Sequence, residues 1–211
     1  MVNRVIVIGA GASGMMSALT AAENGAQVML FEKNDRPGKK ILISGKGRCN
    51  VTTDKDTNEI INSFLHNGKF LYTALNSFSN QQVKYFFEEA GVPLKTERGR
   101  RVFPVSDKAL DIADALQLFI KNKNVEIRRG RAKSLVFEDN VLKGVLTENG
   151  EFYRAQKVLV STGGLSYSAT GSSGDGYELA RQAGHKIVST RPSLVGIYTA
   201  ENLSEAAGLS L

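Results

Sequence analysis

The first 32 residues have the order of a nucleotide-binding unit: an apolar strand, a glycine turn, a helix and a second strand that ends in an acid. The apolar run at residues 5–8 is followed by the turn Gly9-Ala10-Gly11-Ala12-Ser13-Gly14 and by a helical segment at 15–23. A second apolar run at 27–31 leads directly into Glu32. This order restricts the chain to folds in which a strand feeds a helix through a tight glycine turn.

Each residue of this unit has a separate mechanical role in binding a dinucleotide. Gly9 permits the tight turn, Gly11 lets the backbone approach a pyrophosphate, and Gly14 lets the helix pack close to the strand. The helix N-terminus offers free N–H groups and partial positive charge to phosphates. Glu32 follows Gly14 by 18 residues, which suits a carboxylate that accepts hydrogen bonds from a ribose. The pattern predicts a dinucleotide site but does not by itself separate FAD from NAD.

The rest of the chain mixes helical and strand patterns. A small antiparallel meander is expected, because strand patterns alternate with turn residues after position 124. The helix expected at 107–120 has Ser106 as its N-cap, and the run at 157–161 is typical of a buried strand. The other expected helices cover residues 59–65, 69–78, 81–90 and 177–183, and the other expected strands cover 92–94, 101–103, 125–127, 132–137, 141–147 and 151–153.

Composition favours a soluble globular domain, since 42% of the residues are hydrophobic and 23% are charged. The apolar N-terminal stretch is interrupted by glycines, so we interpret it as strand and helix and expect no membrane segment. The chain has one cysteine, Cys49, which cannot form an internal disulfide and fits a reducing cytoplasm. We therefore expect a cytoplasmic protein.

Basic residues cluster at 33–48, 95–101 and 121–133, and the net charge is +6. Such clusters suit ligands that carry phosphate, although solvated faces explain them equally well. The chain lacks an RNA-binding motif with interleaved aromatic residues, which disfavours a nucleic-acid partner.

The segment at 33–50 is the second informative stretch, because it is rich in glycine, lysine and arginine. We expect a loop there rather than a packed element. Glycines let a backbone approach a flat ring or a phosphate, and the cations offset phosphate charge. The consecutive apolar residues Ile41, Leu42 and Ile43 favour ligand contact over a solvated surface loop.

A third glycine-rich stretch follows the apolar run at 157–161. Thr162, Gly163 and Gly164 form a turn at the carboxyl end of that strand, where open α/β sheets bind ligands. Asp175 lies at the start of the next helical segment. It either contributes to the same pocket or only stabilises the helix dipole.

These stretches together resemble the BaiN/RdsA-type family of FAD-dependent oxidoreductases, which are also called aminoacetone-oxidase-like flavoproteins. The resemblance is carried by VIGAGASGMMSA, FEKNDRPGKKILISGKGRCNVT, GRRVFP and STGGLSYSATGSSGDGYELARQAGH. It implies a Rossmann-like FAD-binding fold, a parallel sheet with helices on both faces, here joined by the small meander. It also implies FAD as cofactor, with NAD(P)H as a candidate electron donor.

The resemblance further implies a set of cofactor-binding residues. The glycine turn would hold the FAD pyrophosphate, Glu32 the adenosine ribose, and the backbone of Ala132 the adenine. The segment at 40–50 would line the flavin, and the second glycine turn with Asp175 would complete the pocket. The full set is Gly9, Ala10, Gly11, Ala12, Ser13, Gly14, Glu32, Lys33, Lys40, Ser44, Gly45, Gly47, Arg48, Cys49, Asn50, Ala132, Thr162, Gly163, Gly164 and Asp175.

Members of that family are longer chains with an inserted substrate domain. We therefore expect residues 1–190 to be the FAD-binding domain without its C-terminal return, and 191–211 to begin the inserted domain. The part that would complete the flavin fold is then a candidate partner.

The resemblance and the motifs indicate an FAD-dependent oxidoreductase that acts on a small organic substrate. The alternative is a dinucleotide-binding module without catalytic activity. A single cysteine excludes a redox dithiol within the chain, and neither His66 nor His185 has neighbours that suggest a catalytic triad. No spacing of His, Cys, Asp and Glu indicates a metal site. The sequence assigns no catalytic residue, substrate or choice between NADH and NADPH.

Overall fold

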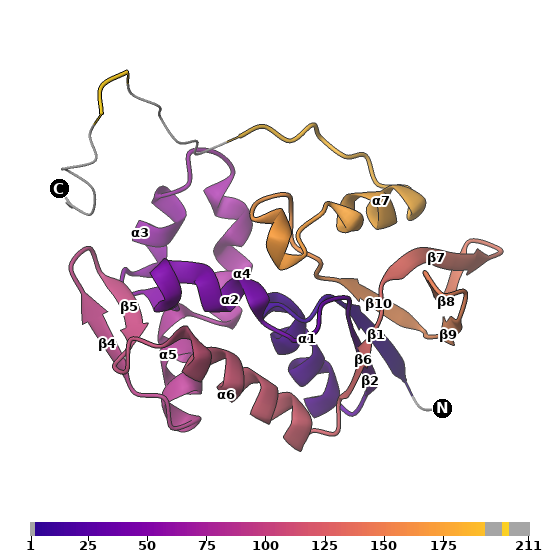
Figure 1. Ribbon diagram of the computed structural model, residues 1–211, viewed down its shortest axis with the longest axis horizontal. Coiled ribbons are helices and arrows are strands. Elements are labelled where there is room, and N and C mark those ends of the chain that lie inside the picture. The colour runs from indigo at the N-terminus through magenta and orange to yellow at the C-terminus, as the bar shows by residue number, and fades with distance from the viewer. Residues whose placement is uncertain (1–2, 193–199, 203–211) are drawn as a thin grey trace.

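A computed structural model describes residues 3–192 and 200–202, and four parallel strands form its central sheet (Figure 1). The strand order is β10 (Lys157–Val160), β1 (Arg4–Ile8), β2 (Gln27–Glu32) and β6 (Glu126–Arg129). Ile8 lies opposite both Phe31 and Val160, so the carboxyl ends of these three strands meet at one edge. The expected parallel sheet is confirmed.

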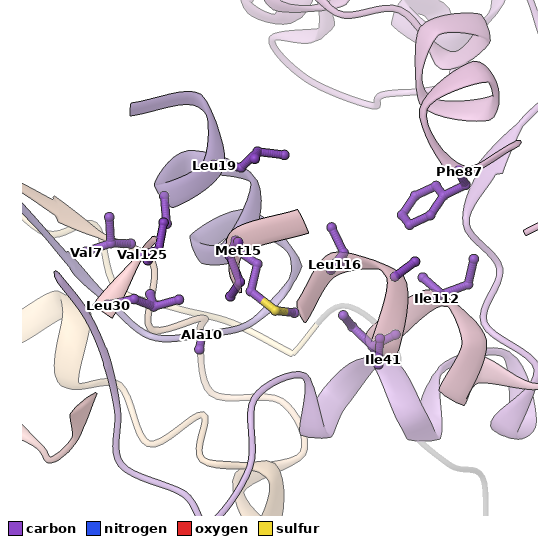
Figure 2. Packing of buried hydrophobic residues seen from close by; sticks show 14 of the residues in the cluster. Val7, Ala10, Met15, Leu19, Leu30, Ile41, Phe87, Ile112, Leu116 and Val125 are labelled. Atoms are coloured by element: carbon purple, nitrogen blue, oxygen red, sulfur yellow. The ribbon is translucent and has the colours of Figure 1, made fainter. Parts of the chain in front are cut away.

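Two long helices cover one face of this sheet. They are α1 (Ala12–Glu23) and α6 (Ala109–Asn122), and Val5 and Val7 of β1 point into the core between them and the sheet. Figure 2 shows Met15 of α1 between the sheet residue Leu30 and Leu116 of α6, and all three side chains are buried. Removing this apolar surface from water stabilises the layer.

The opposite face of the sheet is covered by the antiparallel meander and one helix. The meander consists of β7 (Ala132–Glu138), β8 (Val141–Thr147) and β9 (Phe152–Arg154), and the helix is α7 (Asp175–Gln182). Ile6 and Ile8 alternate with Val5 and Val7, and they pack into this second core. The expected meander is therefore confirmed, and the sheet has a buried core on each side.

A second, smaller sheet lies at the end of the molecule opposite the meander (Figure 1). Its antiparallel strands are β3 (Thr52–Thr53), β5 (Arg101–Pro104) and β4 (Leu94–Glu97). Capping boxes begin two of the helices between β3 and β4, with Asp56 at one N-cap and Ser79 at the other. These helical elements are α3 (Thr57–Asn62), η2 (Gly68–Leu71), α4 (Tyr72–Ser77) and α5 (Asn80–Glu89).

Two local predictions are wrong. Residues 33–50 are not an open loop, because they contain α2 (Lys39–Ile43) and the 3-10 turn η1 (Ser44–Gly47). Ile41 of α2 is 7% exposed and belongs to the main core, so this short helix forms by packing rather than by composition. Ser106 is not an N-cap either: α6 begins with Lys108 as its N-cap, and the Ser106 hydroxyl bonds the Asp111 carboxylate (2.5 Å).

The prediction that the run at 157–161 forms a buried strand is also wrong for the described part of the chain. β10 is the last strand at one side of the sheet, and Leu159 and Val160 are 40% and 42% exposed. A short 3-10 turn, η3 (Ser168–Thr170), follows it before α7.

The second domain expected at 191–211 lies outside the described residues except for 191–192 and 200–202. No helix among the described residues has the length and apolar character needed to cross a membrane.

Candidate functional site

A cavity of about 1570 Å³ opens at the carboxyl ends of the parallel strands. The glycine turn between β1 and α1 forms part of its wall, as do Glu32 at the end of β2 and Thr162 after β10. Ligands of open α/β sheets bind at this edge, and the volume exceeds the roughly 300–1,000 Å³ of ordinary ligand sites. The cavity is therefore large enough for an extended dinucleotide.

The three glycines of the first turn differ in what requires them. A Cβ on Gly14 would lie 1.7 Å from the carbonyl oxygen of Gly9, so the fold itself excludes a side chain there. Gly9 has φ of +99°, and a Cβ there would lie 2.6 Å from the Ser161 carbonyl oxygen. A Cβ on Gly11 would meet no atom within 4 Å. Packing within the chain does not require glycine at position 11.

The N-terminus of α1 faces the cavity next to Gly11. Gly11 is the N-cap, and no side chain caps the helix there. The first turn of α1 contains no acidic residue. The partial positive charge of this helix end is therefore not offset within the turn, which suits a phosphate group.

Glu32 is buried at the cavity wall, with 8% exposure, and it holds the glycine turn. One carboxylate oxygen accepts the Ala10 backbone N–H (2.9 Å), and the other accepts the backbone N–H (2.8 Å) and side-chain amide (2.7 Å) of Asn34. An ionised carboxylate has about four acceptor positions. Glu32 can therefore accept a further hydrogen bond while it keeps the turn in place.

Asp175 forms an ionic cluster that joins three distant segments. Its carboxylate accepts hydrogen bonds from Arg131 (2.9 and 3.1 Å), Lys33 (2.9 Å) and the Ser173 hydroxyl (2.8 Å). The Arg131 guanidinium, and after it Lys33 and Ser173, hold the pKa of Asp175 far below its usual value although partial burial opposes this shift. Asp175 is thus a fixed anion that ties α7 to the ends of β2 and β6.

Among the described residues on the cavity wall, Lys40 is a cation without a carboxylate partner. Its ammonium donates to the Ser166 carbonyl oxygen (2.8 Å) and to the hydroxyl of Ser172 (2.5 Å), and Ser172 is 4% exposed. Among residues 3–192, no carboxylate forms an ion pair with Lys40, whereas the neighbouring Lys39 pairs with Asp35 (2.8 Å). Lys40 therefore brings positive charge to the cavity that an anionic ligand can offset.

The segment at 39–50 lines the cavity only in part. Ser44, Cys49 and Asn50 reach the wall, and burial raises the pKa of the Cys49 thiol. Cys49 is therefore a neutral thiol at neutral pH rather than an activated thiolate. Arg48 is not on the wall: its guanidinium bonds Glu97 of β4 and lies over the ring of Phe103 of β5.

The structure brings most of the predicted site residues to one cavity. Those on its wall are Gly9, Ala10, Gly11, Ala12, Ser13, Glu32, Lys33, Lys40, Ser44, Cys49, Asn50, Ala132, Thr162, Gly163 and Asp175. Those that are not on it are Gly14, Gly45, Gly47, Arg48 and Gly164. Gly14 acts one layer behind the wall, because it lets α1 approach the turn.

Sequence analysis did not single out Asn34 and Ser172, which hold Glu32 and Lys40 in place. Both lie inside the motifs that carry the family resemblance. Their roles depend on side-chain contacts with Glu32 and Lys40, which the spacing of residues in the sequence does not predict. The hydroxyl of Thr162 is buried and has no hydrogen-bond partner among the described residues. Within the same residues, no cluster of His, Cys, Asp and Glu could hold a metal ion.

The sequence matches a known protein family and several curated relatives. Residues 3–207 match the model of the HI0933-like protein Rossmann domain. The chain is 34% identical to the 3-dehydro-bile acid delta(4,6)-reductase of Clostridium scindens, covering 98% of this chain and 50% of the reductase. It is 32% identical to the ribosomal RNA dihydrouridine synthase of Escherichia coli, covering 90% of this chain and 46% of the synthase. The chain thus spans about half the length of these curated relatives.

Solved structures share the fold. One is the 3-ketosteroid-delta4-(5alpha)-dehydrogenase of Rhodococcus jostii RHA1, with a TM-score of 0.61 and 18% identity over 78% of this chain and 47% of the dehydrogenase. Another is THI4 of Thermovibrio ammonificans, with a TM-score of 0.55 and 17% identity over 87% of this chain and 64% of THI4. At these identities the likeness concerns the fold alone.

Proposed function

The chain belongs to the family of HI0933-like proteins with a Rossmann domain, and on that premise we propose that it binds FAD as part of a flavin-dependent oxidoreductase. The family resemblance read from its motifs is thereby confirmed. The observation that carries the proposal is the open space at Gly11, beside the uncapped N-terminus of α1. No neighbouring protein atom would clash with a side chain at this position, so the glycine is explained by a ligand that lies in close contact with the backbone there.

The residues of the cavity fit FAD. The α1 N-terminus and the backbone at Gly11 would hold the pyrophosphate, and Lys40 would offset its charge. Glu32 would accept hydrogen bonds from the adenosine ribose, and it would repel a 2′-phosphate. The buried, unpartnered hydroxyl of Thr162 is a further polar group at the same wall. Once bound, FAD supplies the redox chemistry through its isoalloxazine ring.

The protein's contribution is then position and electrostatics. The buried carboxylate of Glu32 accepts the Ala10 N–H and so holds the glycine turn in place. The same carboxylate would fix the position of the ribose relative to this turn. The segment with Ser44, Cys49 and Asn50 would face the isoalloxazine ring, and Ala132 would offer backbone groups to the adenine. The un-ionised Cys49 thiol fits a packing role at that wall.

Titration of the purified protein with FAD tests this proposal. Flavin is first removed, FAD is added, and binding is followed by flavin fluorescence and absorbance. Saturation at one FAD per chain, followed by anaerobic bleaching of the flavin by NADH or NADPH, supports an oxidoreductase with a nicotinamide donor. FAD binding without reduction by either donor would favour the alternative of a non-catalytic module. No saturable binding would contradict the proposal.

We propose a small organic substrate, following the bile acid reductase among the relatives. The ribosomal RNA dihydrouridine synthases of two bacteria support a second candidate, uridine in RNA. The two are separated by whether substrate binding depends on salt. For an RNA substrate contacted through phosphates, the logarithm of the affinity falls linearly with the logarithm of the salt concentration, whereas the affinity for an uncharged small molecule does not depend on salt in this way.

A further part of the protein, in this chain or in a second one, is proposed to cover the β10 edge. β10 pairs with β1 on one side and with no strand of the described residues on the other, and its Leu159 and Val160 side chains are exposed, which supports this proposal. Supplying that part should raise flavin occupancy and melting temperature together, since a ligand that binds the folded state stabilises it. Unchanged occupancy and melting temperature would contradict it. The domain division at residue 190 and a cytoplasmic location remain predictions.

A further inference from the structure

Arg48 is half-buried and does not lie on the cavity wall. The next residues, Cys49 and Asn50, reach the cavity wall, whereas the Arg48 guanidinium contacts residues of the second sheet and of the turn after it. Its guanidinium lies over the ring of Phe103, with 4.2 Å from Cζ to the ring centroid. Phe103 is 3% exposed, so the stacking platform is a fixed part of β5.

Two carboxylates hold the guanidinium on this platform. Arg48 donates from Nε to Asp107 (2.8 Å), and its terminal nitrogen bonds both Asp107 (2.7 Å) and Glu97. Lys95 bonds Asp107 on its far side (2.7 Å), so two cations and two anions form a neutral cluster. Hydrogen bonds from Arg48 and Lys95 hold the pKa values of Glu97 and Asp107 below their usual range, so both remain ionised at neutral pH.

The backbone next to Arg48 is in an unusual conformation. Gly45, Lys46, Gly47 and Cys49 all have positive φ, with values of 55°, 59°, 85° and 60°. Lys46 and Cys49 carry side chains, so their left-handed conformation is unfavourable unless contacts enforce it. A Cβ on Gly45 would lie 3.2 Å from the Phe103 ring, which places this turn directly on the same platform.

We propose that Arg48 is a positioning residue: it clamps the left-handed turn at 45–49 onto the β4–β5 hairpin, so that Ser44, Cys49 and Asn50 face the cavity. Arg48 is not on the cavity wall, so in this proposal it acts through the turn rather than by contact with the cofactor. The proposal rests on the proposed function only in naming FAD as the group that Ser44, Cys49 and Asn50 would face. The clamp is a property of the chain, and it can be measured without any ligand.

Cys49 is the natural reporter of this clamp, because it is the one cysteine in the sequence and is 7% exposed. The experiment measures the rate at which a thiol reagent labels Cys49 in the purified protein, without FAD, across low urea concentrations. Arg48→Met should label about tenfold faster than wild type at zero urea, because the turn opens locally. Arg48→Lys should also label faster, since an ammonium can neither stack nor bond both carboxylates in one plane.

The matched control is Arg101→Met. Arg101 lies over the same ring, at 5.9 Å from Cζ to the centroid, and among the described residues its side chain bonds no carboxylate and donates to the Arg98 carbonyl oxygen. It should label at the wild-type rate. Asp107→Asn breaks the clamp more mildly, and it should raise the labelling rate by less than Arg48→Met does. It keeps the test usable if Arg48→Met folds poorly.

The proposal is overturned if Arg48→Met and Asp107→Asn both label at the rate of the Arg101→Met control. It is also overturned if their rates rise only in step with global unfolding, which the urea dependence reveals. A wild-type protein that fails to bind FAD would contradict the proposed function and leave the labelling result valid. Weaker FAD binding by Arg48→Met, with faster labelling, would link the clamp to the cofactor site.

Discussion

The two walls of the cavity are built in different ways. The glycine turn at 9–14 is continuous with β1 and α1, and its hydrogen-bond partner Glu32 is buried at the end of β2, in the same βαβ unit. The second wall, at 44–50, is a short turn in left-handed conformation that partly exposed ion pairs hold to the β4–β5 hairpin and the residues after it. The first wall is fixed by local geometry and the second by long-range contacts. We expect changes in the first to affect folding or binding strongly and changes in the second to loosen the site.

The largest effect is expected from Gly14→Val. The new side chain would overlap the Gly9 carbonyl, since a Cβ there lies 1.7 Å from that oxygen. The helix must then move away from the strand. We expect the free energy of unfolding to fall by roughly 4–5 kcal/mol or more, a loss that few point mutants reach. Circular dichroism and urea unfolding measure it. A variant with wild-type stability would show that α1 does not pack against the turn in this way.

Glu32→Ala comes next, because it removes three hydrogen bonds from a buried carboxylate. We expect a loss of roughly 2–3 kcal/mol in stability and at least about tenfold in FAD affinity. Glu32→Gln is the matched control for charge, since its amide keeps one acceptor for the Ala10 N–H. FAD affinity of Glu32→Ala within about twofold of wild type would remove Glu32 from the ribose site.

Lys40→Met tests the charge of the cavity. Its ammonium has no carboxylate partner among residues 3–192, so its loss should weaken FAD binding by about tenfold and reduce the dependence of that binding on salt. Lys39→Met is the control, because Lys39 also lies on the cavity wall but its charge is paired with Asp35. Equal effects of the two substitutions would show that only net charge matters.

Asp175→Asn should have the smallest effect, about 1 kcal/mol of stability at neutral pH, because both cations are partly exposed and screened. The pKa of Asp175 is lowered in the folded state, so its contribution exists above its ordinary value of 3.8 and is lost as the pH falls below that. Wild type should therefore lose more stability than Asp175→Asn on acidification below about pH 4. Parallel curves for the two proteins, from urea unfolding at several pH values, would contradict this.

The same contrast explains what the sequence could predict. The glycine turn, Glu32 and the meander were predictable, because strand and helix periods and turn residues act over a few positions. The helix at Lys39–Ile43 was not, since Ile41 becomes helical by packing against α6. The Arg48 clamp joins residues 49 and 59 positions apart, which no spacing argument relates. The apolar run at Lys157–Val160 predicts a strand but not what lies beside it.

The central claim is that FAD lies against the open backbone at Gly11, and Gly11→Val tests it most directly. Valine fits the extended backbone of this position, with φ of −79° and ψ of −173°, and its Cβ would meet no protein atom within 4 Å. We predict that the variant keeps the wild-type circular dichroism spectrum and melting temperature without FAD, and that it shows no saturable binding in an FAD titration where wild type binds one FAD per chain. A folded Gly11→Val protein that binds FAD with wild-type affinity would contradict the account.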